Sequence, residues 1–421
     1  MLTLKLAWRS FARHKRRSAI TAAAIALGLA MLLASIGLAT DGHARMAELG
    51  IRLGAGHVVV QGRGYQERQT ADIVVPDPDR VARAARAIPG ARHAARRVYA
   101  SGLLASGHLS AAVMVAGVDP RIEPDVSDIA SADHRVRGRY LRPRDARDFA
   151  SEPADVYIGD QLARTLAVDV GDRVVLTVAP SGNGEPAATA LRIAGIFHTG
   201  VDELDGFYAQ IPLADAQELL GLGRAVTQVA VFADDLRAVD RITAALRATF
   251  GADSALEILP WQQALRELYE AIVLDDLGNY LMHAIVFAIV AIGIFNTVLM
   301  SVVERTREFG VMMAIGASRT RMFAVVLSEA AILAIVACAA GVAIALALHG
   351  WLSTTGLDVS QFYGEDFEFA GIAFRGRIYS TLYPSQVAGW TAAVFAIVLA
   401  SALYPALRAT RLEPVEAMRH A

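Results

Sequence analysis

The sequence predicts an α-helical membrane protein with four transmembrane helices and a large external α+β domain between the first and the second. Three observations lead to this fold class. The chain has 421 residues, of which 54% are hydrophobic and only 19% are charged. Four long windows carry almost no charge, and a segment of mixed composition separates the first two. Cations gather at particular ends of these windows, which indicates an orientation in the membrane.

The four apolar windows are long enough to cross a bilayer, which requires about 20 predominantly apolar residues. They are residues 18–40, 277–303, 322–352 and 386–407. The first window is longer than the apolar part of a signal peptide, which spans about 7–15 residues. A buried helix of a soluble protein would rarely be so long and so free of charge. We therefore expect four membrane-spanning helices.

The cations indicate which side of the membrane each connecting segment occupies, because arginine and lysine are enriched in short cytoplasmic segments. They stand before the first window, between the second and third, and after the fourth. Segment 353–385 is rich in acids instead. We expect both termini, loop 304–321 and tail 408–421 in the cytoplasm, with segments 41–276 and 353–385 on the outer side. The cations are Lys5, Arg9, Arg13, Lys15, Arg16, Arg17, Arg305, Arg307, Arg319, Arg321, Arg408, Arg411 and Arg419.

Residues 1–17 have the pattern of an amphipathic helix. Leu4, Trp8 and Phe11 recur at helical spacing, and basic residues fill much of the remaining surface. This pattern predicts a cytoplasmic interfacial helix on the inner leaflet. An unstructured basic tail is the alternative.

Segment 41–276 predicts a mixed domain with short helices and strands. Asp77-Pro78 and Asp234 are expected to begin helices, and a third helix is expected at 213–220. Alternating or β-branched runs bounded by turn residues predict strands. The strand candidates are 57–61, 110–118, 173–179, 190–197 and 227–232. The domain follows one span and precedes the next, so its two ends are expected to lie close together.

Catalytic and metal-binding motifs are absent from the sequence. It contains no HExxH, CxxC or GxSxG pattern, and its single cysteine, Cys338, excludes an intrachain disulfide. The two lysines, Lys5 and Lys15, lack the glycine-rich context of a P-loop, so the chain carries no P-loop ATPase of its own. The histidines are scattered, and the acid-rich stretch 202–206 is interpreted as a solvated turn rather than a calcium site. A net charge of −2 disfavours nucleic-acid binding.

Three polar side chains fall inside the predicted spans, where such groups are costly: Asn296, Thr297 and Glu329. Hydrogen bonding between helices and the lining of a cavity are two interpretations. For Glu329 a third is an interfacial ion pair with Arg305 or Arg321. Small residues in the spans permit close helix packing within one chain or between protomers. They include Gly28, Gly37, Gly293 and Gly341.

The cytoplasmic loop is more elaborate than a connector requires. Its sequence, ERTREFGVMMAIGASRTRM, places the apolar run 311–315 between clusters of charge. An apolar segment on the cytoplasmic side of a membrane needs a partner to cover it.

This loop resembles that of the FtsX-like permeases of ABC transporters, the group that includes MacB, LolC and LolE. Two further stretches are similar to the family: ALYPALRATRLEPVEAMRH at 402–420, and AWRSFARHKRRSAITAAAIALG near the start of the chain. The span count, the large first external domain and the orientation agree with it. The loop residues that carry the pattern are Glu304, Arg305, Glu308, Phe309, Gly310, Ala314, Gly316 and Ala317.

The resemblance implies two permease chains working with two separate ABC ATPase subunits. The loop would form a coupling helix that docks in a groove of each ATPase, and ATP and Mg would bind to the ATPase, leaving this chain without a cofactor. Helix movements would then act on external domains, a mechanism called mechanotransmission. Besides the pattern residues, the coupling segment contains Val311, Met312, Met313 and Ile315.

Within the family, the length and the absence of a fused ATPase favour the LolC and LolE branch. That branch implies release of outer-membrane lipoproteins from the bacterial inner membrane to a periplasmic carrier. The region 180–187 is short for a carrier-capturing hook, and segment 353–385 is long. A homodimer and a heterodimer both remain open. The alternatives are a MacB-type exporter of peptides or drugs and an FtsX-like non-transporting regulator of a cell-wall hydrolase.

Overall fold

The computed structural model describes residues 15–146, 152–178, 186–251, 255–358, 368–369, 372–373 and 377–410. The chain divides into two compact units. The helical unit contains residues 1–43, 273–362 and 376–421, and the β-rich unit contains 44–272 and 363–375.

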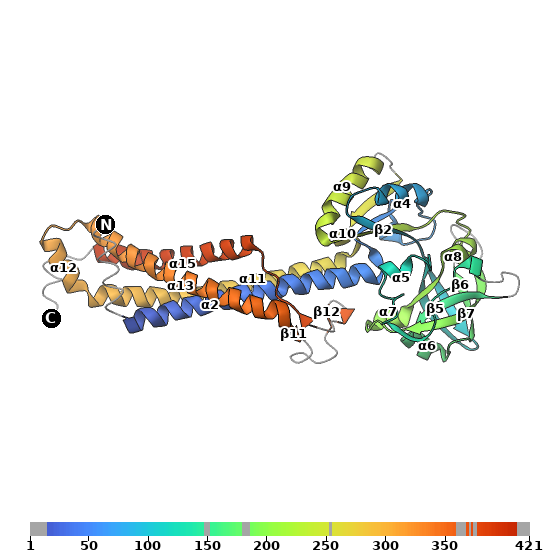
Figure 1. Cartoon of the computed structure of the whole chain (residues 1–421), viewed down its shortest axis with the longest axis horizontal. Helices are drawn as coiled ribbons and strands as arrows, with labels where there is room; N and C mark the ends of the chain where they lie inside the picture. Colours follow the sequence, from blue (N-terminus) through green and yellow to red (C-terminus); the bar gives the residue numbers. More distant parts are fainter. Residues whose placement is uncertain are drawn as a thin grey trace. The chain divides into compact units, whose positions relative to one another are not determined.

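Within the described residues, four helices are long and apolar enough to cross a membrane. They are α2 (Lys15–Gly50), α11 (Arg266–Glu304), α13 (Arg319–Thr355) and α15 (Pro384–Thr410) (Figure 1). A short helix, α12 (Thr306–Ala314), follows α11. Each predicted span overlaps one long helix, and the limits of the embedded parts stay a prediction.

Two of these helices continue beyond the lengths that a bilayer requires. Helix α2 extends past residue 40 to Gly50, and α11 begins at Arg266, before the predicted span at 277. The division between the two units falls inside both helices, at His43 in α2 and at Val273 in α11. Both helices therefore contribute residues to both units.

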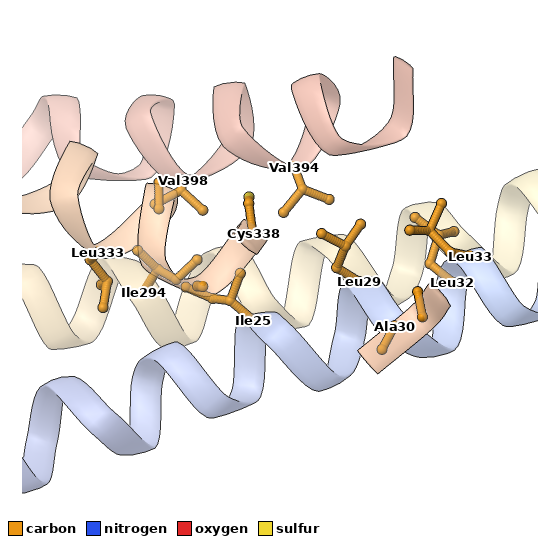
Figure 2. Packing of buried hydrophobic residues seen from close by; sticks show 13 residues of the cluster. Ile25, Leu29, Ala30, Leu32, Leu33, Ile294, Leu333, Cys338, Val394 and Val398 are labelled. Atoms are coloured by element: carbon orange, nitrogen blue, oxygen red, sulfur yellow. The ribbon is translucent and has the colours of Figure 1, made fainter. Parts of the chain in front are cut away.

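The core of the helical unit forms where the four long helices face one another. Ile25, Leu29 and Leu33 recur every four residues along α2, which places them on one face. Figure 2 shows these side chains gathered with residues of α11, α13 and α15. At Gly341 of α13 an added Cβ would lie 2.9 Å from the carbonyl oxygen of Ala26. The small residue therefore permits close packing within one chain at this position.

The β-rich unit is built on ten strands, of which the longest, β2, belongs to two sheets. The first part of β2 extends the antiparallel order β10-β1-β9-β2, and its second part joins the ring β2-β3-β8-β5-β7-β6, which closes because β6 pairs with both β7 and β2. Strand β4 pairs with β7. The strands are β1 (Val58–Gly62), β2 (Ala91–Ser106), β3 (Leu109–Val118), β4 (Arg135–Gly138), β5 (Ala154–Gly159), β6 (Arg173–Val178), β7 (Ala187–Phe197), β8 (Tyr208–Pro212), β9 (Gln228–Ala233) and β10 (Leu256–Pro260).

Short helices connect these strands, and α4 and α9 pack on the four-stranded part. The predicted cap of α4 is confirmed, since Asp77 accepts a hydrogen bond from the Arg80 amide at 3.0 Å. The predicted cap at Asp234 is wrong by one position, because Asp235 accepts from the Ala238 amide. The helices are α3 (Tyr65–Arg68), α4 (Pro78–Arg86), α5 (Glu123–Val126), α6 (Asp160–Leu166), α7 (Asp202–Phe207), α8 (Leu213–Leu219), α9 (Val239–Phe250) and α10 (Trp261–Ala264), with single-turn helices at η1 (Ile51–Ala55), η2 (Arg144–Ala146) and η3 (Leu236–Ala238).

All five predicted strands are present, as β1, β3, β6, β7 and β9. Strands β2, β4, β5, β8 and β10 were not predicted. The first half of β2 contains several arginines and a histidine, which hide its alternation from a reading of hydrophobicity alone. It pairs with β9 along this first half and with β3 along the second half, and this pairing stabilises it as a strand.

Several predictions lie wholly or largely outside the described residues. These are the interfacial helix at 1–17, whose described part begins with α2 at Lys15, the hook region at 180–187 and the tail at 408–421. In segment 353–385, short pairs link β11 (Leu357–Asp358) with β14 (Arg377–Ile378) and β12 (Glu368–Phe369) with β13 (Ile372–Ala373).

Candidate coupling site

The loop between α11 and α13 is a short helix with defined ends. Helix α12 ends at Ala314, and two residues later Gly316 has a positive φ of +99°. The Gly316 amide donates to the Met313 carbonyl at 3.1 Å, and the Ala317 amide donates to the Met312 carbonyl at 2.9 Å. This is the Schellman arrangement, which satisfies the last carbonyls of a helix. Ser318 then caps α13 by accepting from the Arg321 amide.

Arg305 fixes the start of this loop. Its Nη1 donates to Glu329 of α13 at 2.6 Å, and its Nε donates to Glu308 of α12 at 2.9 Å. Its guanidinium carbon also lies 5.1 Å from the centre of the Phe309 ring. Burial disfavours the charged form, but the two carboxylates outweigh it and raise the pKa of Arg305 above its ordinary value. One side chain therefore ties α12 to α13.

The inner face of α12 packs against the ends of the long helices. Phe309 is fully buried in a cluster with Val302, Met322 and Ala406. Met312 and Met313, which belong to the predicted coupling segment, are partly buried against the same cluster. Much of the methionine surface is thus covered by this chain itself.

The outer face of α12 exposes different apolar residues. Val311 is 45% exposed and Ile315 is 80% exposed. Glu304, Glu308 and Ala314 are also exposed, whereas Gly310 is buried. Burial could not be assigned from the sequence, because consecutive apolar residues 311–315 point in all directions around a helix. The chain itself therefore leaves Val311 and Ile315 largely uncovered.

The three polar residues predicted within the spans lie in different surroundings. Glu329 forms the ion pair with Arg305. Thr297 donates to the Gly293 carbonyl at 2.8 Å and lies 3.4 Å from the hydroxyl of Thr21 on α2, which is a hydrogen bond between helices. The Asn296 side chain is exposed on α11. The structure therefore brings two of the three into contacts between elements.

Within the β-rich unit, the segment that follows α2 contacts a buried ion pair that the sequence did not reveal. Arg97 of β2 donates to Glu123 at 2.6 Å, and both side chains are at most 1% exposed. Arg97 and Tyr99 also donate to the carbonyl of Gly54 in η1. Burial disfavours the Arg97 charge, yet Glu123 outweighs it and raises the pKa of Arg97. The turn after α2 is therefore held by side chains of the longest strand.

Within the helical unit, a second set of contacts involves residues 37–43 of α2. His43 lies 2.8 Å from Asp275 of α11. Asp41 accepts from the Tyr379 amide at 2.9 Å, and the Thr381 amide donates to the Gly37 carbonyl at 2.9 Å. Segment 353–385 thus includes a stretch that packs along α2, a role that its acidic composition did not indicate.

One group in the described residues has side chains of the type that bind metals. Asp160, His198 and Asp205 place ligand atoms within 4.8 Å of one another. His198 lies 2.8 Å from Asp205, which also accepts from the amide and hydroxyl of Thr199. These contacts explain the group as a hydrogen-bonded loop, and we assign no metal to it.

The architecture defines a multi-pass membrane protein with a β-rich domain inserted between its first two long helices. Residues 18–249 match the model of the MacB-like periplasmic core domain, and residues 280–414 match that of the FtsX-like permease C-terminal region. The chain therefore belongs to the FtsX-like permeases of ABC transporters that carry a MacB-like periplasmic core domain.

Individual relatives agree with this assignment. The chain is 25% identical over 339 residues to the lipoprotein-releasing system transmembrane protein LolC of Neisseria meningitidis, covering 78% of each chain. It is 23% identical over 321 residues to LolE of Haemophilus influenzae, covering 75% of this chain and 74% of the relative. Among solved structures, the periplasmic region of MacB from Actinobacillus actinomycetemcomitans is 16% identical, with a TM-score of 0.35, covering 52% of this chain and 95% of that region.

Proposed function

We propose that this ABC transporter permease works by mechanotransmission and releases outer-membrane lipoproteins from the bacterial inner membrane. In this proposal both termini are cytoplasmic and a separate ABC ATPase subunit binds ATP and Mg. A second permease copy, identical or related, completes the membrane part, and a periplasmic carrier receives the lipoprotein.

The observation that carries the proposal is the exposed apolar face of α12. Val311 and Ile315 are held outward on a helix whose inner face is anchored by Phe309 and Arg305. Exposed apolar residues on a fixed helix fit a hydrophobic groove of a partner protein. In an ABC transporter that partner is the ATPase.

The two continuous helices supply a route for movement. Because α2 and α11 contribute residues to both units, a displacement of their cytoplasmic ends acts directly on the β-rich unit. Arg97 and Tyr99 hold the turn after α2, so that this displacement is not lost in a flexible linker. The cargo is inferred from the relatives, which are named as lipoprotein-releasing proteins.

The proposal is tested by Ile315→Asp, with Ile315→Leu as the matched control. A charge at the centre of an apolar contact should weaken ATPase binding by about tenfold or more, whereas leucine should preserve it. Two quantities are measured: the ATPase that copurifies with the permease, and the release of a triacylated lipoprotein from proteoliposomes. Normal complex formation and release by the aspartate variant would refute the assigned coupling face.

A MacB-type export function is the second candidate, and the match to the MacB-like core domain favours it. In that case the complex would bind a periplasmic adaptor protein, and ATP hydrolysis would respond to a peptide or drug rather than to a lipoprotein. The same proteoliposomes distinguish the two, because lipoprotein would then leave the ATPase rate unchanged.

A further inference from the structure

A pocket of about 500 Å³ lies in the β-rich unit and has no part in the coupling site. Its walls include Leu53 and Gly54, which follow α2, and Leu265, which immediately precedes α11. The remaining lining residues come from the end of α2, from η1, α3, α7 and α10, and from the strands β2, β3, β8 and β9, with Gln69 and Val201 beside these elements. The pocket thus lies beside the two segments that connect the β-rich unit to the long helices, one directly after α2 and one directly before α11.

The lining is mostly apolar and aromatic with three glutamines, and none of the lining residues is charged. Leu53, Met114 and Leu204 contribute hydrocarbon, and Phe207 is 43% exposed on α7. A pocket of a few hundred Å³ with such walls is typical of sites for apolar ligands.

Several polar groups in the walls already have partners. The Tyr99 hydroxyl donates to the Gly54 carbonyl at 3.0 Å. The side-chain amide of Gln66 donates to the Ala264 carbonyl at 3.3 Å, and that of Gln228 donates to Gln61 at 3.0 Å. These donors are turned to the protein itself, so the pocket offers mainly ring faces and hydrocarbon to a ligand.

The walls are held in place by the buried core. Leu53, Tyr99, Met114 and Leu204 pack against a cluster that includes the fully buried Tyr157 and Phe197. The ion pair of Arg97 next to Tyr99 holds the same wall. The pocket therefore does not depend on a ligand for its shape.

We propose that this pocket binds one acyl chain of a lipid-modified protein. The absence of any cation among the lining residues argues against a phospholipid, whose phosphate would enter unpaired. The thioether, ester and amide groups of an acylated cysteine are neutral, so they can lie beside a lining that has no charged side chain. The inference deepens the proposed function and rests on it for the source of the chain.

The test uses the full chain with its ATPase in lipid nanodiscs and two photoreactive probes. One is a synthetic triacylated lipopeptide with a diazirine near the end of one chain, and the other is phosphatidylethanolamine with the same chain. Mass spectrometry should locate lipopeptide adducts on peptides that contain Met114 or Leu204. Met114→Trp, which fills the pocket, should reduce this labelling about tenfold. Leu109→Trp lies on the same strand, outside the lining and 45% exposed, and should leave it unchanged.

Equal pocket labelling by the phospholipid, or no pocket labelling by the lipopeptide, would overturn the proposal. Leu204→Trp on α7 repeats the test from the opposite wall, and a protease-digestion pattern like that of the native chain verifies the fold of each variant. Release of lipoprotein is measured in parallel. Normal release without pocket labelling rejects the acyl site alone, whereas pocket labelling without release supports the site and rejects the proposed transport function.

Discussion

The helical unit and the β-rich unit place their apolar and charged side chains in opposite ways. In the helical unit Met31, Leu274 and Ile289 are 73%, 69% and 66% exposed. In the β-rich unit a charged pair, Arg97 and Glu123, is almost completely buried. The difference follows from the surrounding medium, since lipid accepts exposed apolar side chains and water does not.

This comparison shows that two kinds of interaction stabilise one chain. Lipid tails are as apolar as leucine, so helices in a membrane associate through close contact rather than through escape from water. The near approach of α13 to α2 at Gly341 is an instance. The β-rich unit instead buries apolar surface and tolerates a buried charge when it is paired. Substitutions in each unit should therefore fail for different reasons.

The largest effect is expected for Glu123→Gln in the β-rich unit. The substitution leaves the Arg97 charge buried without its counterion, which typically destabilises a protein by about 3–5 kcal/mol. Urea-dependent proteolysis of the β-rich unit in the full chain measures the loss. Combining Arg97→Met with Glu123→Leu should restore most of the stability, because no charge then remains unpaired.

The matched control is Asp145→Asn, which removes a surface ion pair with Arg121. Those side chains are 65% and 64% exposed, so the change should stay within about 0.5 kcal/mol. A Glu123→Gln protein as stable as this control would contradict the distinction between buried and exposed charge.

A smaller effect is expected for Gly341→Ala in the helical unit. The new methyl group meets the Ala26 carbonyl and the Leu29 side chain, and such overpacking costs about 1–3 kcal/mol. Gly293→Ala on α11 is the control, because nothing lies within 4 Å of its added carbon. Thermal unfolding in detergent compares them. Equal melting temperatures would show that α2 and α13 are not closely packed.

The smallest effect concerns acid stability of the β-rich unit. Burial alone would raise the pKa of Asp155, but hydrogen bonds from Arg139 and Arg142 outweigh it and hold that pKa below its ordinary value of about 3.9. Because the pKa is lower in the folded state, this contribution is present above the ordinary pKa and is lost as pH falls through the lowered value. Asp155→Asn should flatten the acid limb of the stability profile measured by urea titration.

Asp169→Asn, which alters an exposed pair with Arg137, provides the comparison for that titration. It should keep the native acid slope. An unchanged slope in Asp155→Asn would show that this carboxylate contributes nothing to acid sensitivity.

The parts of the fold that were predictable have local causes. The four long apolar windows overlap the long helices, and Asp77-Pro78 begins α4 as its local chemistry requires. Strand β2 was missed because Arg96 and Arg97 interrupt its apolar pattern. Their partners, Asp79, Asp119 and Glu123, come from distant positions that no single-sequence pattern connects.

In the candidate coupling site, too, local features were predictable from the sequence and tertiary contacts were not. The amphipathic loop and the charges around it were visible in the sequence, as was the possible pairing of Glu329 with Arg305. The sequence did not show which apolar side chains of the run 311–315 face outward, and in the structure Ile315 is the most exposed large side chain among them. Helical phase depends on where α12 begins and on which neighbours cover it.

By itself, the sequence determined the membrane class, the inserted domain and the amphipathic character of the loop at 304–321, because hydrophobic length, charge placement and turn residues act over short stretches of chain. The tertiary structure alone decided the closed strand ring, the buried Arg97–Glu123 pair and the apolar pocket of the β-rich unit. Each of these depends on residues far apart in sequence, whose contacts are set by packing and burial rather than by local preference.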